Sequence, residues 1–119
     1  MKPITPENRR SANVSEGFTP FVYPDGVALG DAILQPNTDR PLGEGFHLYR
    51  MPPGMTTRGH RHEGEEHFYV IEGDLTDNDG RSFGPGDIVS YRDGTEHSSH
   101  TRNGCLLVVW ISGPETVLD

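Results

Sequence analysis

Two histidines and a glutamate lie close together in this chain at the spacing of metal ligands. His60 and His62 are separated by a single residue, so on an extended strand both imidazole rings leave the same face. Glu66 follows shortly after and has the same parity. We therefore expect three metal-ligating side chains to point into one cavity.

The elements that must position these side chains are short β-strands. No stretch of a dozen residues repeats its apolar positions with the helical period of about 3.6, so the sequence predicts an all-β fold. Fifteen glycines and ten prolines suit short strands joined by tight turns, and an inward-facing metal site favours a barrel or jelly roll. Strands are expected at residues 27–35, 45–51, 56–62, 66–72, 75–76, 82–83, 88–91, 97–101 and 105–111.

The length of 119 residues predicts one domain with an arm in front of it. Residues 1–28 are polar and proline-rich with scattered aromatic residues, and we interpret them as an arm that packs on the barrel or on a partner subunit. Residues 29–119 are expected to form a single barrel.

Charge and hydropathy exclude several classes of function. Eighteen acidic and ten basic residues give a net charge of −8, which is the wrong sign for holding the phosphates of nucleic acids. The longest apolar run, 105–111, is far shorter than the roughly 20 residues that span a bilayer, so no membrane segment is expected. The N-terminal residues lack the apolar core of a secretory signal and Cys105 has no cysteine partner, which predicts a cytoplasmic protein.

The spacing around the two histidines resembles the first sequence motif of the cupin superfamily. That motif has the form Gly-x5-His-x-His-x3-Glu-x6-Gly, and every fixed position is matched here by Gly54, His60, His62, Glu66 and Gly73. The resemblance implies a double-stranded β-helix, the jelly-roll barrel of cupins, with one metal ion, and a homodimer as the assembly.

A second cupin motif follows and supplies a fourth ligand by resemblance. Gly86, Gly94 and His97 stand at its intervals, whereas Arg92 replaces its proline and Thr101 its asparagine. The resemblance therefore implies a metal held by His97 together with the three donors of the first motif.

Three imidazoles and one carboxylate suit one divalent transition metal per chain rather than calcium. Iron is the expected ion, with zinc, manganese, nickel, cobalt and copper as alternatives. Four protein ligands leave two positions of an octahedron open, where a small-molecule ligand or substrate can bind.

Within the superfamily, the sequence is similar to the cupin half of ChrR-type anti-sigma factors and to small diketone-cleaving dioxygenases. The first hypothesis is a metal-dependent, Fe(II) dioxygenase-type oxidoreductase that acts on a small oxygen-bearing molecule. The second is a non-enzymatic sensor of a metal or small molecule. The third is a sugar isomerase or epimerase, for which Tyr91 and His47 are the available proton-transfer candidates; no catalytic residue beyond the ligands is assigned.

Three further residues are candidates for the wall of the substrate cavity. Arg58 shares the parity of His60, Phe68 shares the parity of Glu66, and Tyr91 lies close to the second motif. His67 and His100 have the opposite parity to their neighbouring ligands and are expected at the surface.

Overall fold

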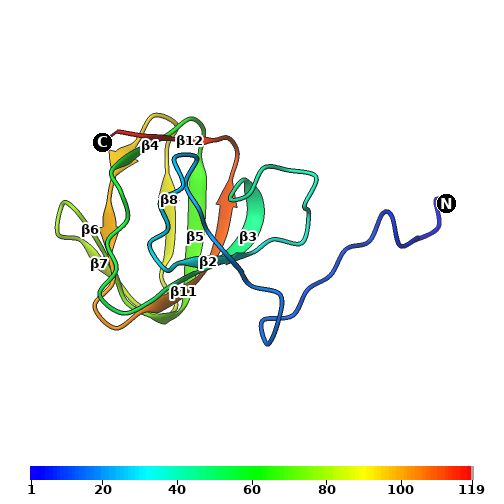
Figure 1. Cartoon of the computed structure of the whole chain (residues 1–119), viewed down its shortest axis with the longest axis horizontal. Helices are drawn as coiled ribbons and strands as arrows, with labels where there is room; N and C mark the ends of the chain where they lie inside the picture. Colours follow the sequence, from blue (N-terminus) through cyan, green and yellow to red (C-terminus); the bar gives the residue numbers. More distant parts are fainter. Residues whose placement is uncertain (119) are drawn as a thin grey trace.

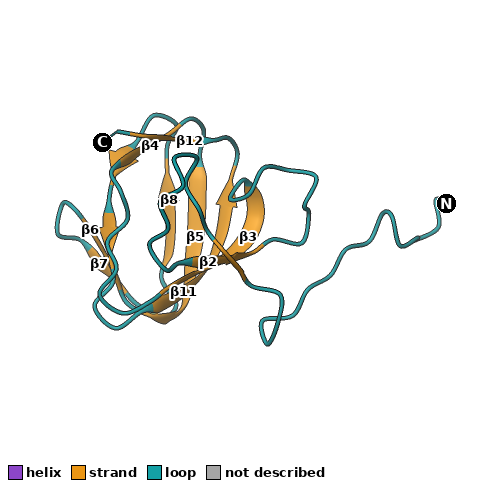
Figure 2. Ribbon diagram, in the orientation of Figure 1, coloured by secondary structure: helices purple, strands orange, loops and turns teal. Residues whose placement is uncertain are grey.

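The computed structural model describes residues 1–118, and this part of the chain is built from strands and loops (Figures 1 and 2). The predicted all-β class is confirmed. The strands, in chain order, are β1 (Thr19–Pro20), β2 (Ala32–Leu34), β3 (Gly45–Met51), β4 (His60–His62), β5 (Glu66–Gly73), β6 (Leu75–Asp77), β7 (Ser82–Phe83), β8 (Ile88–Tyr91), β9 (Glu96–His97), β10 (Ser99–His100), β11 (Cys105–Ile111) and β12 (Glu115–Val117).

The strands form three antiparallel sheets. The large sheet has six strands in the order β1-β2-β3-β11-β5-β8, and two small sheets have the orders β10-β6-β7 and β12-β4-β9. Among the described residues, no strand pairing joins these sheets to one another. The jelly roll therefore differs from a closed barrel, in which hydrogen bonds between strands continue all the way round. None of the described residues forms a helix suited to crossing a bilayer.

The core follows from the alternation of side chains along the strands of the large sheet. In β5, Phe68 and Val70 share the inward parity of Glu66 and are 4% and 0% exposed. The buried apolar cluster lies on this inner face and contains Met51, Met55, Phe68, Val70, Leu75, Cys105, Leu107, Val109 and Ile111. Ligands and core thus face the same interior.

Four expected strands have the predicted bounds and the others differ. The structure has strands at the expected residues in β3, β7, β8 and β11, and β5 extends one residue beyond its expected end. The expected strand 97–101 is divided, because His97 pairs with β4 whereas Ser99 and His100 pair with β6. This segment therefore passes from one small sheet to the other.

Two strands were not predicted. β1 pairs with β2 at one edge of the large sheet, and β12 pairs with β4 opposite His60 and His62. Both are too short for an alternation of apolar and polar residues to develop. The absence of β12 from the prediction matters for the candidate metal centre described below, because β12 lies beside the strand that carries His60 and His62.

The residues interpreted as an arm lie partly away from the body of the protein. Figure 1 shows the first part of the chain, drawn in dark blue, running outward to an N-terminus far from the sheets. Arg10 contacts Asn37 and Asp39 at 2.6 Å each, and Phe18 lies under the Arg50 guanidinium with 3.9 Å between the ring centroid and Cζ. Residues 21–25 lie against the body and line a pocket described below.

Two motif glycines have conformations that explain their place in the sequence. Gly73 ends β5 with φ of 86°, and a Cβ atom there would lie 2.0 Å from the carbonyl oxygen of Gly104. Gly94 has φ of 86° in the turn before His97, and its N–H donates to the carbonyl of His62 at 2.9 Å. These positions favour glycine because other residues rarely adopt positive φ.

Candidate metal centre

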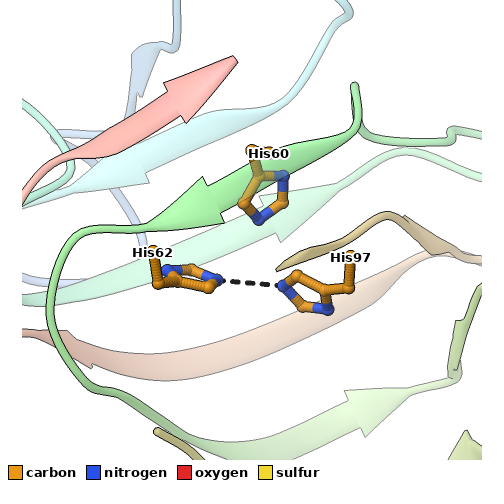
Figure 3. A group of neighbouring side chains, drawn as sticks. All are labelled: His60, His62 and His97. Carbon is orange, nitrogen blue, oxygen red and sulfur yellow. Dashed lines mark hydrogen bonds between the residues drawn. The ribbon is translucent and has the colours of Figure 1, made fainter. Parts of the chain in front are cut away.

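Three histidines from two paired strands meet inside the fold. His60 and His62 lie on β4, His97 lies on β9, and His60 is the cross-strand partner of His97. Figure 3 shows the three rings turned toward one another, with the Nε2 atoms of His62 and His97 3.0 Å apart. His60 and His62 are buried, with 7% and 0% exposure, so these donors are shielded from bulk water.

Glu66 brings a carboxylate to the same point from β5 of the large sheet. Its Oε1 atom lies 3.3 Å from His62 Nε2 and 3.7 Å from His97 Nε2. Donors that each lie about 2.0–2.2 Å from one ion are at most about 4.4 Å apart, and these separations meet that limit. His60 groups with His62 and His97, whose ligand atoms all lie within 4.8 Å of one another. Glu66 forms a second such group with His62 and Glu115, so the histidines and glutamates gathered here can hold a metal ion.

Hydrogen bonds fix which nitrogen two of the rings present to the interior. His60 Nδ1 lies 2.8 Å from the carbonyl oxygen of Arg58, and His97 Nδ1 lies 3.0 Å from Asp77 Oδ1. A backbone carbonyl and an ionised carboxylate can only accept hydrogen bonds. Each Nδ1 therefore carries the proton, and each Nε2 keeps its lone pair. Metal-bound histidines are held in the same way by a carbonyl or a carboxylate.

Asp77 is a positioning residue that sequence reasoning did not identify. Its buried carboxylate accepts hydrogen bonds from His97, from Ser99 Oγ at 2.8 Å and from the Tyr91 hydroxyl. Burial raises the pKa of Asp77, but the hydrogen bonds from His97, Tyr91 and Ser99 outweigh it and lower the pKa overall. Asp77 thus remains an ionised acceptor behind His97.

The Tyr91 side chain lies outside the inner cavity and contacts residues of the candidate metal centre. Its ring lies parallel to that of His62, with 6.2 Å between centroids, and its hydroxyl donates to Asp77. Burial and the Asp77 carboxylate raise the pKa of Tyr91, which keeps the hydroxyl protonated. The predicted cavity residue therefore holds Asp77 in place.

Glu115 on β12 is a second carboxylate at the site and was not predicted. Its Oε1 atom lies 3.8 Å from both His60 Nε2 and His62 Nδ1, and the latter atom is buried with no hydrogen-bond partner among residues 1–118. Burial raises the pKa of Glu115 and the Glu66 carboxylate raises it further, against the opposite effect of His60 and His62. The available signal was a short β-prone triplet, Glu-Thr-Val, after Gly113 and Pro114.

The donors face a cavity of about 80 Å³. Phe68, one of the predicted wall residues, lines it, and so does His47, which is 3% exposed. His47 Nδ1 lies 3.1 Å from the carbonyl of Gly45, and burial lowers the pKa of this ring. The remaining wall is largely apolar, with side chains such as Met51 and Leu107.

Arg58 lies outside the inner cavity, at the rim of a second pocket. Its Nη1 atom contacts Asp25 Oδ2 at 2.8 Å, and its guanidinium carbon lies 4.9 Å from the centre of the Tyr23 ring. This residue, predicted for the cavity wall, thus connects the loop before β4 to the segment that follows β1.

The histidines of opposite parity lie apart from the centre. His67 projects to the outer face of the large sheet and stacks on Trp110, with 5.2 Å between ring centroids. His100 is exposed, with Nδ1 2.7 Å from Thr56 Oγ1. Cys105 is buried, and burial raises the pKa of its thiol to about 11, so it packs as a small apolar side chain.

An all-β jelly roll with a buried histidine and glutamate cluster defines the protein as a cupin. A sequence model described as the ChrR cupin-like domain matches residues 34–112, and the chain belongs to that family. A search of curated proteins found no match.

Solved structures show the same fold. An acetylacetone dioxygenase from Acinetobacter johnsonii superimposes with a TM-score of 0.74 at 16% identity, covering 100% of this chain and 83% of that one. An RmlC-like cupin protein from Ralstonia eutropha gives 0.69 at 17% identity, covering 86% of this chain and 66% of that one. This chain thus spans just under two thirds of the Ralstonia protein.

The structure of Rhodobacter sphaeroides SigE in complex with the anti-sigma ChrR is also similar. The TM-score is 0.52 at 28% identity, over 66% of this chain and 42% of the matched chain. The likeness covers less than half of that protein.

Proposed function

We propose that this cupin binds one divalent transition metal through His60, His62, Glu66 and His97. With Fe(II), it acts as a dioxygenase-type oxidoreductase on a small oxygen-bearing molecule. The observation that carries the proposal is the convergence of histidine and glutamate donors, with the Nε2 atoms of His62 and His97 3.0 Å apart and Glu66 Oε1 3.3 Å from His62 Nε2. The lone pairs of two such nitrogens repel each other unless a cation or a proton lies between them.

The side chains would divide the work of binding and orientation. An iron ion supplies the one-electron chemistry toward dioxygen that amino-acid side chains lack. His97 is oriented by Asp77 and His60 by the Arg58 carbonyl, so the donor geometry is set before metal binds. Phe68 and the apolar wall limit the access of water.

Glu115 gives the cavity an acceptor that is not among the proposed ligands. Its side chain lines both the inner cavity and the second pocket, and its Oε1 atom lies 3.8 Å from nitrogen atoms of two of the proposed ligands. It is placed to accept the proton that an acidic enol or hydroxyl group loses on binding. Glu115→Gln should keep the metal content while weakening the binding of such ligands.

A non-enzymatic sensor is the second candidate function. The family match to the ChrR cupin-like domain and the likeness to the ChrR complex support it. A sensor would bind a metal or small molecule without turnover. Sugar isomerisation ranks third, because the Tyr91 hydroxyl is committed to Asp77 outside the inner cavity and only His47, whose Nδ1 faces the Gly45 carbonyl, lines that cavity as a proton-transfer candidate.

The first experiment is elemental analysis of protein purified anaerobically without a metal-affinity tag. We expect about one equivalent of transition metal per chain, with iron favouring the oxygenase and zinc favouring a sensor. Oxygen uptake is then measured across β-diketones, catechols, thiols and hydroxyketones. A protein that takes up no metal from any of the candidate ions would refute the proposal, and iron-loaded protein without oxygen uptake would favour the sensor.

We further propose a homodimer formed through the outer face of the large sheet. This face carries exposed apolar side chains on four adjacent strands, including Phe46, Tyr69, Ile88 and Trp110, which are 56%, 44%, 79% and 40% exposed. Few charges interrupt it although the whole chain carries −8, so two copies can approach here without strong repulsion. A second copy presents the same face, as a two-fold interface requires.

A further inference from the structure

A second, larger pocket, which we call the vestibule, borders the metal cavity. It has a volume of about 410 Å³ and is lined by residues 21–25, residues 41–44, Arg58 and residues near β12. Phe21, Tyr23, Gly43 and Glu115 line both spaces. The two spaces are therefore adjacent and share part of one wall.

The volumes indicate that the vestibule belongs to the binding site. Small-molecule pockets in proteins commonly measure about 300–1,000 Å³. The inner cavity, at about 80 Å³, holds little more than the group that contacts the metal, whereas the vestibule adds about 410 Å³. Most of a substrate's bulk would lie in the vestibule.

The vestibule wall is mainly apolar and remains open to water. It contains three prolines and two aromatic rings, together with Val22 and Leu42, which are 48% and 46% exposed. Covering such side chains with an apolar group removes hydrocarbon surface from water, which favours binding by about 25 cal/mol per Å². The wall thus suits an aliphatic or aromatic substituent.

The charges around both spaces disfavour a multiply charged anion. The one arginine of the vestibule, Arg58, is paired with Asp25 at 2.8 Å, and the wall also contains Glu44 and Glu115. Among the described residues, the inner cavity is lined by no lysine or arginine. A divalent ion there would face the carboxylates of Glu66 and Glu115, which already offset its charge.

We propose that the vestibule binds an apolar substituent of the substrate, while two oxygens of the same molecule face the metal. The substrate class is an uncharged or singly charged molecule with adjacent oxygen donors and an aliphatic or aromatic tail. Sugar phosphates and dicarboxylates are rejected. This inference rests on the proposed metal centre and adds which class of substrate that site accepts.

A series of hydroxamic acids tests the proposal, because they bind metals through two oxygens and their tails can be varied. The full chain loaded with cobalt(II) is titrated with acetohydroxamic, butanohydroxamic and hexanohydroxamic acids, with calorimetry and visible absorption as readouts. Each added methylene should tighten binding up to about fourfold. Succinic monohydroxamate, whose tail ends in a carboxylate, should lose this gain.

Variants at the vestibule locate the effect. Leu42→Asp and Val22→Asp should bind acetohydroxamate like the unmodified protein but show little dependence on tail length. Leu118→Asp is the matched control, since Leu118 is also 46% exposed and does not line the vestibule. This control should keep the full dependence on tail length.

The outcomes separate this inference from the metal proposal. If acetohydroxamate binds normally but affinity does not change with tail length, the proposal that the vestibule binds the tail is refuted and the metal-centre proposal is unaffected. A tail effect that persists in both vestibule variants would also overturn it. Failure of the protein to take up cobalt, or of acetohydroxamate to alter its spectrum, would overturn both.

Discussion

Replacing Asp77 by asparagine tests whether the ring of His97 is held for metal binding. The Asp77 carboxylate accepts hydrogen bonds from His97 Nδ1 at 3.0 Å and from Ser99 Oγ at 2.8 Å. Asparagine has nearly the same shape and can still accept from these two donors through its amide oxygen. The substitution therefore removes the negative charge and leaves the packing almost unchanged.

The expected effect is a loss of metal affinity of about tenfold to a hundredfold, which is typical when the partner of a metal-bound histidine is removed. The metal-free protein should lose about 1–3 kcal/mol of unfolding free energy, because charge-assisted hydrogen bonds in a buried site are weakened. The affinity loss should exceed what this destabilisation alone causes, since the variant remains folded at neutral pH.

The assay is a competition for zinc or cobalt between the protein and a chromophoric chelator, with urea unfolding of the metal-free protein measured in parallel. Asp79→Asn is the matched control, because Asp79 is exposed on the turn after β6 and its carboxylate accepts a local N–H, that of Arg81 at 3.0 Å. Equal metal affinity for Asp77→Asn and the unmodified protein would refute the reasoning.

Three further predictions concern the ligands, the acid stability and the assembly. His62→Ala should lose most bound metal and the rise in melting temperature that metal gives, whereas His100→Ala should retain both; equal metal content by elemental analysis would contradict the ligand assignment. The backbone N–H of Arg102 lowers the pKa of Asp74, so this carboxylate stabilises the fold above the ordinary aspartate pKa and loses that effect as pH falls through its lower folded value. In urea unfolding, Asp74→Asn should have an unfolding free energy about 1 kcal/mol lower than the unmodified protein at pH 7, and this difference should shrink below about pH 4. A difference that stays constant with pH would show that the charge of Asp74 is not its cause. Trp110→Lys should convert the proposed dimer to a monomer in light scattering coupled to size-exclusion chromatography, and an unchanged mass would reject that face as the interface.

The sequence was sufficient to predict the strands that alternate clearly and the residues on one strand face. β3 and β11 are long enough for the period of two to be visible, and the parity of His60 and His62 places both rings inside. The motif spacing added His97, whose proximity to His60 depends on pairing between strands far apart in the sequence.

The residues that the sequence did not reveal owe their position to contacts between distant segments. Asp77 ends the short strand β6, and its contact with His97 arises because neighbouring β10 pairs with β6. Glu115 reaches the centre because β12 pairs with β4, and a three-residue strand has too little periodicity to be predicted. Local pattern does not encode such pairings.

The pairing of β12 with β4 also bears on the order in which the protein can mature during synthesis. Glu115 and Val117 lie opposite His62 and His60, so β4, which pairs with β9 on its other side, gains this neighbour only after residues 115–117 have left the ribosome. Contacts of such long sequence separation form late and slowly. Until β12 pairs with β4, this edge of the strand that carries His60 and His62 lacks its cover in the nascent chain, and the two histidines are accessible to metal ions from that side.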